Sequence, residues 1–100
     1  METTRRMAFI NKKYPGKTDQ EIYEKVDAVM EGIARRHSLD YRRDPVARRG
    51  SVAKMGASGS YAVADGQVTV ELKYPMIVPG AMRRKVEEDI ERKLQGLFGS

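Results

Sequence analysis

Few side chains in this chain of 100 residues could perform chemistry. His37 is the only histidine, and it ends a predicted helix, where the negative end of the helix dipole favours an imidazolium. A Ser-His-Asp arrangement would also need a positioned third group and an oxyanion hole, and no spacing in the sequence identifies them. The chain has no Cys, which excludes a disulfide framework, a thiolate zinc site and a cysteine nucleophile. We therefore expect a protein that is not an enzyme, with no catalytic residue, metal or cofactor.

Four carboxylates lie close together near the C-terminus, at Glu87, Glu88, Asp89 and Glu91. Glycosidase chemistry needs two carboxyl groups at a fixed separation in a cleft, with the pKa of one of them raised by burial. These four lie opposite the apolar stripe of their predicted helix, so we interpret them as a solvated face paired with the cations that precede them. A divalent metal site finds no support in any ligand-loop spacing.

Three arginine doublets crowd six cations into residues 35–49. They are Arg35 and Arg36, Arg42 and Arg43, and Arg48 and Arg49. Such a cluster is a candidate contact for an anion or a nucleic acid, and a solvated basic face is the alternative. Strand alternation sends Arg42 and Arg43 to opposite faces, which would split the cluster.

A second candidate contact follows the last predicted strand. The segment Met76, Ile77 and Val78 is apolar and stands between two prolines, and it could touch a hydrophobic surface or a partner. Arg83 and Arg84 follow in the first turns of a helix, the end where the dipole disfavours cations. We take these five residues as the candidate partner contact, and packing of the apolar segment against the sheet as the alternative.

A hairpin is the clearest structural signal among the elements that must position these residues. Asp65-Gly66 joins two runs of alternating apolar and polar residues, and both residue types accept the positive φ of a type I′ turn. Val68, Val70 and Leu72 fall on one face of the second run, so that face needs a cover.

Two helical stretches supply the cover, over Asp19–His37 and Ala81–Phe98. The first begins with a capping box at Thr18 and Glu21. Strands are expected over residues 6–14 and 38–44, and a third runs from residue 51 through a bulge at Gly56 and Gly59 into the hairpin. The sequence therefore predicts an α+β fold of order β-α-β-β-β-α, a four-stranded antiparallel sheet with both helices on one face. We expect one domain over residues 1–100, with 1–5 and 99–100 disordered.

The net charge is +5, which suits acidic partners but does not require them. No apolar run approaches the roughly 20 residues that span a bilayer, and the N-terminus lacks the apolar region of a secretory signal. We expect a cytoplasmic protein.

The second half of the chain resembles the polyhydroxyalkanoic acid system (granule region) proteins. The matching features are the Ser58-Gly59 step into a strand, the short hairpin, the VELKYP strand and the terminal helix KVEEDIERKLQGLF. The first half agrees more loosely, through a basic strand, an amphipathic helix and a Leu-Asp-Tyr strand. Members are small bacterial proteins linked to polyester granules, so the resemblance implies an association and supplies no catalytic residues.

Two functions stay open. The first is a non-enzymatic accessory protein that binds a granule surface or a protein partner, with a homodimer among the options. The second is a basic RNA- or ribosome-binding module, since the predicted topology and charge are similar to those of ribosome-hibernation factors. A helix over an antiparallel sheet also resembles helix-grip proteins, which hold apolar ligands, although 100 residues leave little room for such a cavity.

Overall fold

The computed structural model describes residues 5–54, 56–75 and 79–98. Within these ranges the chain forms five strands and two helices in the order β-α-β-β-β-β-α. The elements are β1 (Arg5–Lys13), α1 (Asp19–His37), β2 (Asp40–Asp44), β3 (Arg49–Lys54), β4 (Ala57–Ala64), β5 (Gln67–Pro75) and α2 (Gly80–Gln95). The predicted disorder of residues 1–5 and 99–100 lies outside these ranges, except at Arg5, which begins β1.

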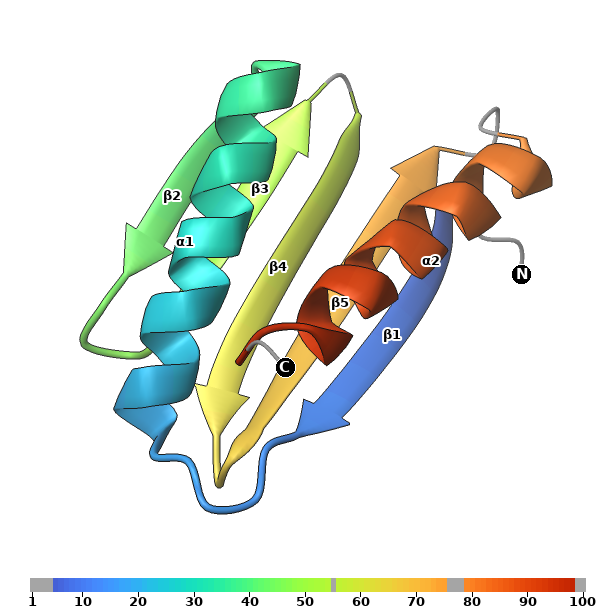
Figure 1. Cartoon of the computed structure of the whole chain (residues 1–100). Coiled ribbons are helices and arrows are strands. Elements are labelled where there is room, and N and C mark those ends of the chain that lie inside the picture. The colour runs from blue at the N-terminus through green and yellow to red at the C-terminus, as the bar shows by residue number, and fades with distance from the viewer. Residues whose placement is uncertain (1–4, 55, 76–78, 99–100) are drawn as a thin grey trace.

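The strands form one antiparallel sheet in the order β1-β5-β4-β3-β2. Figure 1 shows both helices on the same face of this sheet, with α1 over β2, β3 and β4 and α2 over β5 and β1. Within the described ranges, no helix covers the other face (Figure 1). The predicted class and the placement of both helices are therefore confirmed. Neither helix of the described chain is long and apolar enough to cross a membrane.

The predicted number of strands was wrong, because residues 51–64 do not form one strand with a bulge. β3 ends at Lys54, which pairs with Ala57 at the start of the antiparallel β4. Gly56 lies between them with a φ of 90°, a conformation that glycine adopts without strain. The chain therefore reverses here, and the sheet gains a fifth strand.

The predicted hairpin is present between β4 and β5. Asp65 and Gly66 have φ values of 54° and 73°, the positive sign that both central residues of a type I′ turn need. Along β5, buried and half-buried residues alternate strictly from Gln67 to Pro75. The apolar half of this alternation faces the helices and the polar half faces the open side, as the sequence pattern predicts.

The start of α1 holds this hairpin in place. The two carboxylate oxygens of Asp19 accept hydrogen bonds from the backbone N–H groups of Asp65 (3.2 Å) and Gly66 (2.7 Å). The N–H of Tyr14 donates to the Gly66 carbonyl oxygen (2.9 Å). A single side chain thus joins the first helical turn to a turn nearly fifty residues away in the sequence.

The core lies between the sheet and the helices. Its buried side chains are Ile10, Ile22, Tyr23, Val26, Met30, Tyr61, Val63, Val68, Val70, Leu72, Tyr74, Leu94 and Leu97. α1 contributes Ile22, Tyr23, Val26, Met30 and Ala34, whereas within α2 only Leu94 is buried. The two helices are therefore docked to very different extents.

Candidate functional site, a groove between the helices

A groove of about 520 Å³ opens between α1 and α2. Apolar side chains from both helices and from the sheet beneath make up most of its lining: Met30, Ile33, Leu39, Val52, Ala57, Leu72, Met82, Val86 and Ile90. The sequence led us to expect little room for an apolar cavity between helix and sheet, and the structure has at this place a groove that is open to solvent. Its volume falls in the range of about 300–1,000 Å³ that small-molecule sites occupy.

The groove exists because the two helices cover different parts of the sheet. α1 packs against β2, β3, β4 and β5, whereas α2 packs chiefly against β1 at the sheet edge. Figure 1 shows the resulting separation of the two helices above β4 and β5. At the floor, Gly59 brings no side chain, and Leu72 reaches so close that a Cβ there would lie 3.0 Å from its Cδ2. The Leu72 side chain therefore covers Gly59, and the floor of the groove is apolar.

α2 is held at its C-terminal end and presents its N-terminal half to the groove. Leu94 and Leu97 are buried, and the Tyr14 hydroxyl donates to the Leu94 carbonyl oxygen (2.6 Å). The Phe98 ring packs edge-on against Tyr14, with ring centroids 5.3 Å apart. Met82, by contrast, is 57 % exposed and Val86 is 38 % exposed. These two residues form an apolar lip on the α2 side of the groove.

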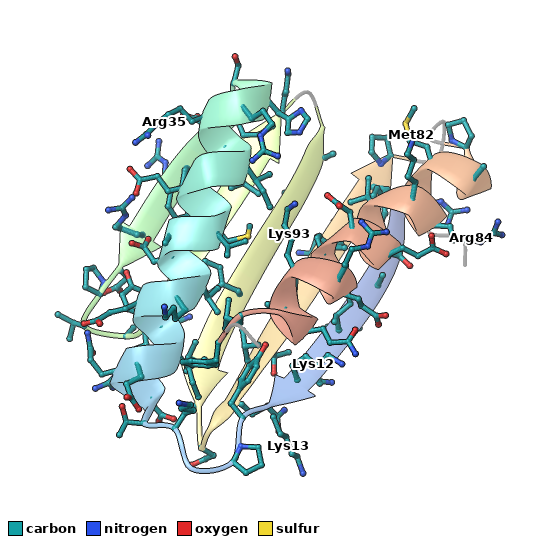
Figure 2. The ribbon with its side chains drawn as sticks, viewed as in Figure 1. Lys12, Lys13, Arg35, Met82, Arg84 and Lys93 are labelled. Atoms are coloured by element: carbon teal, nitrogen blue, oxygen red, sulfur yellow. The ribbon has the colours of Figure 1, made fainter. Side chains whose placement is uncertain are left out.

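Polar side chains stand at the rim. The Lys54 ammonium donates to the backbone carbonyl oxygen of His37 (2.8 Å), so it lies at the C-terminal end of α1. Asp89 is paired with Arg92 (3.1 Å) and Lys93 (3.8 Å). Figure 2 shows Lys93 pointing from α2 into the space between the helices, and Met82 farther along the same helix.

A network of tyrosines lies between α1 and the sheet. The hydroxyl oxygens of Tyr41 and Tyr61 are 2.6 Å apart, and the Tyr41 hydroxyl donates to Asp27 (2.6 Å). Tyr61 must therefore donate to Tyr41. Its ring lies over Gly50 of the neighbouring strand, where a Cβ would come within 2.8 Å of the ring. Burial raises the pKa of Tyr61 to about 12, and burial with the Asp27 hydrogen bond raises the pKa of Tyr41 as well. These phenols stay protonated at neutral pH, and they act as structural hydrogen-bond groups.

The arginine doublets do not form one patch. Arg43 faces α1 and pairs with Asp27 (3.2 Å) and Glu31 (3.3 Å), and Arg35 also pairs with Glu31 (2.9 Å). Arg48 donates to Gln20 (3.3 Å), while Arg36 is exposed at the end of α1. The predicted split of Arg42 and Arg43 thus appears in the contacts that Arg43 makes with α1.

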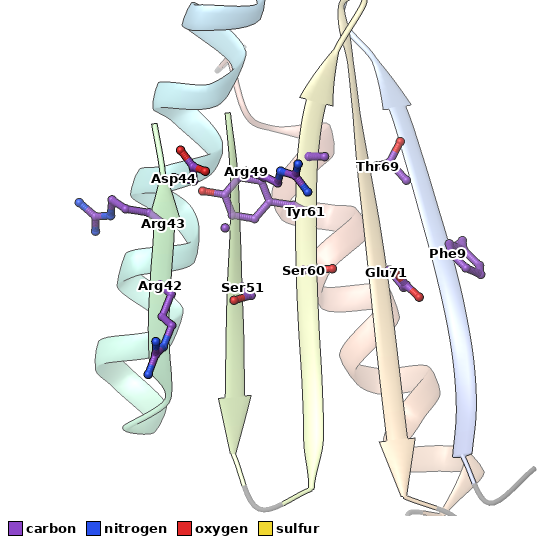
Figure 3. Close-up of a pocket in the computed structure, with 12 residues that line it drawn as sticks. Phe9, Arg42, Arg43, Asp44, Arg49, Ser51, Ser60, Tyr61, Thr69 and Glu71 are labelled. Carbon is purple, nitrogen blue, oxygen red and sulfur yellow. The ribbon is translucent and has the colours of Figure 1, made fainter. Parts of the chain in front are cut away.

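Arg42 and Arg49 belong to the open side of the sheet. Figure 3 shows both beside Ser51, Ser60 and Tyr61, with Thr69, Glu71 and Phe9 across the strands. These residues line a second, more polar hollow of about 480 Å³. It mixes cations with Asp44 and Glu71, so it does not concentrate one sign of charge.

The second predicted contact is only partly visible. Met76, Ile77 and Val78 lie outside the described residues. Arg83 is half-buried, and its Nε is enclosed without a hydrogen-bond partner among the described residues, while Arg84 is exposed. The lip residues Met82 and Val86 lie in the first half of α2, as these two arginines do.

Of the groups weighed for catalysis, His37 and Asp89 both line the groove, and no hydrogen bond joins them among the described residues. His37 is exposed at the groove end, and its backbone oxygen, not its ring, makes the contact with Lys54. The described residues contain no group of three or more His, Asp or Glu side chains that could hold a metal ion. In the sequence, Met30 and Ile33 share the apolar period of the buried residues of α1, and Met82, Val86 and Ile90 share that of Leu94 in α2. Periodicity alone does not separate a stripe that meets the sheet from one that stops short of it.

Comparisons with known proteins give two findings, while no curated protein matches the chain. A crystal structure of a TBP-like protein from Parabacteroides distasonis matches with a TM-score of 0.63 and 9 % sequence identity. The match covers 73 % of this chain and 56 % of that chain, so it shows a shared fold and spans little more than half of the other protein. Residues 15–98 match the family described as "Putative polyhydroxyalkanoic acid system protein", which confirms the resemblance seen in the sequence. The chain therefore belongs to this polyhydroxyalkanoic acid system protein family.

Proposed function

We propose that this protein is a non-enzymatic accessory protein of the polyhydroxyalkanoic acid system that binds the polyester granule surface, or a protein partner on it, through the groove between α1 and α2. One observation carries the proposal. Met82 and Val86 are 57 % and 38 % exposed beside an already apolar groove. Apolar lips of this kind mark contact surfaces, because they leave hydrophobic area in water until something covers them.

The chemistry of the lining fits an aliphatic surface. Thioether and branched aliphatic side chains dominate the groove, and methionine adapts its shape to irregular apolar partners. Polyester chains offer alkyl groups and ester oxygens and carry no charge along their length. Burying each methylene group contributes about 0.8 kcal/mol, so a few alkyl contacts give measurable binding.

Co-sedimentation with polyester granules tests the proposal. Met82→Asp places a charge on the lip, and we expect it to remove most of the protein from the granule pellet. Phe9→Asp is the matched control, because Phe9 is an equally exposed apolar residue (61 %) on the opposite, open side of the sheet. Equal loss of binding in both variants, or in neither, contradicts the proposal. Granules stripped of protein separate the two modes, since direct surface binding persists on them and partner binding does not.

The open face of the sheet supports a second candidate, RNA binding, since Arg42 and Arg49 both line its hollow. RNA affinity would then fall steeply with salt, and charge reversal of both arginines would weaken it further. Arg36 is the control, because it is an exposed arginine at the end of α1 and does not line this hollow. Absence of binding to a mixed RNA at low salt would end this candidate.

A further inference from the structure

The charges around the groove differ between its two sides. Asp89 is the only carboxylate that lines it among the described residues, and Arg92 and Lys93 already pair with that group. Lys54, on the β3 side, donates one hydrogen bond to the His37 carbonyl oxygen. An ammonium has three donors, so Lys54 can still bind an anionic oxygen at the groove end. The rim thus suits a ligand with a negative head.

The body of the groove suits a single alkyl chain. Its volume of about 520 Å³ is that of a small-molecule site. Met30, Ile33 and Ile90 offer aliphatic walls rather than stacked aromatic rings. An alkyl chain gains affinity from such walls in proportion to the length that is buried.

We propose that the groove binds a free aliphatic hydroxy acid, with the alkyl chain between α1 and α2 and the carboxylate on Lys54. The inference rests on the proposed function, because a hydroxyalkanoic acid is the building unit of the polyester to which the family name refers. It goes further in one respect. The soluble acid and the granule surface compete for one site, so free acid releases the protein from granules.

Calorimetric titration with 3-hydroxydecanoate and with its methyl ester tests the head-group contact. The acid should bind about threefold to tenfold more tightly than the ester, which is the effect expected of one partly exposed charged hydrogen bond. Along the series 3-hydroxyhexanoate, 3-hydroxyoctanoate and 3-hydroxydecanoate, affinity should rise about threefold to fourfold for each methylene group. Equal affinity for acid and ester, or a flat chain-length series, overturns the inference.

Substitution of Lys54 tests whether this residue binds the carboxylate of the acid. Lys54→Met should weaken acid binding to the level of the ester and leave ester binding unchanged, while Lys54→Arg should keep the preference for the acid. Lys13→Met is the matched control, because Lys13 is an exposed strand lysine at the far end of the molecule from Met82 (Figure 2). A loss of both acid and ester binding in Lys54→Met, with no rescue by arginine, would show a structural role and contradict the contact.

Competition on granules separates this inference from the function on which it rests. 3-Hydroxydecanoate should move the wild-type protein from the granule pellet to the supernatant, and the methyl ester should do so less well. Granule binding that depends on Met82 but ignores the free acid would leave the proposed function standing and overturn the inference. Acid binding without any granule binding would support the groove ligand and overturn the granule function.

Discussion

The two helices of this domain are attached to the sheet by different means. α1 has a complete capping box, in which the Thr18 hydroxyl accepts from Glu21 N–H (3.1 Å) and the Glu21 carboxylate accepts from Thr18 N–H (2.9 Å). It buries five side chains, and its first turn holds the hairpin through Asp19. α2 begins at Pro79 without a side-chain cap, has no acidic residue in its first turn and buries only Leu94. α1 is thus part of the core, whereas α2 has exposed apolar residues that can contact a ligand.

The largest difference should appear when one apolar residue of each helix is truncated. Ile22 is fully buried, so Ile22→Ala should lower the free energy of unfolding by about 2–5 kcal/mol through lost burial and a cavity. Val86→Ala should change it by less than about 0.5 kcal/mol, because Val86 already meets water. Urea denaturation measures both, and similar losses would show that α2 is as firmly docked as α1.

High pH should destabilise the fold through its buried phenols. Burial raises the pKa of Tyr61 to about 12, and burial with the negative charge of Glu87 raises the pKa of Tyr74 to about 12. An unfolded tyrosine titrates near 10, so the unfolded chain loses protons first as the pH rises. The free energy of unfolding should be flat below about pH 10 and should fall between about pH 10 and 12. If the full tyrosinate absorbance of the native protein appears near pH 10, the raised pKa values of Tyr61 and Tyr74 are contradicted.

Removing one tyrosine hydroxyl under each helix should change the free energy of unfolding by unequal amounts. Tyr61→Phe, under α1, loses the hydrogen bond to Tyr41 and should cost about 1 kcal/mol. The Tyr74 hydroxyl, beside α2, is buried and makes no hydrogen bond of ordinary geometry among the described residues, although the Glu87 carboxylate is close enough to raise its pKa, so Tyr74→Phe should cost less than Tyr61→Phe. Thermal unfolding of both variants checks this, and a larger loss for Tyr74→Phe would reverse the comparison.

Substitutions at the two helix starts should change the stability in opposite directions. Thr18→Ala should cost about 1 kcal/mol, because it opens the capping box of α1. Ala81→Glu should instead add about 0.3–1 kcal/mol, because an acidic side chain then meets the positive end of α2 beside its arginines. A destabilised Ala81→Glu would mean that the cations at this end already have anionic partners.

Much of this fold follows from local patterns. The capping box fixed the start of α1, and the predicted span Asp19–His37 coincides with the helix. Asp65-Gly66 fixed the hairpin, and the alternation along β5 fixed which face is buried. The fifth strand was missed because β3 has few large apolar residues, and because Gly56 is compatible with a bulge as well as with a turn.

The groove could not be predicted in the same way. Met82, Val86 and Ile90 continue the apolar period of Leu94, so the sequence places all of them in one buried stripe. Only the position of α2 over the sheet edge, away from α1, leaves the first part of that stripe uncovered. The distance between two helices depends on side chains of both helices and of the sheet, and no single segment encodes it.

Chemical-shift mapping tests the central claim most directly. Backbone and methyl NMR spectra of the labelled protein would be recorded while 3-hydroxydecanoate is added. If the groove is the binding site, the perturbed signals will cluster at Ile33, Val86 and Ile90 and will leave Phe9 and Ser60 on the open face unchanged. Perturbations that cluster on the open face, or no saturable change at any residue, would contradict it.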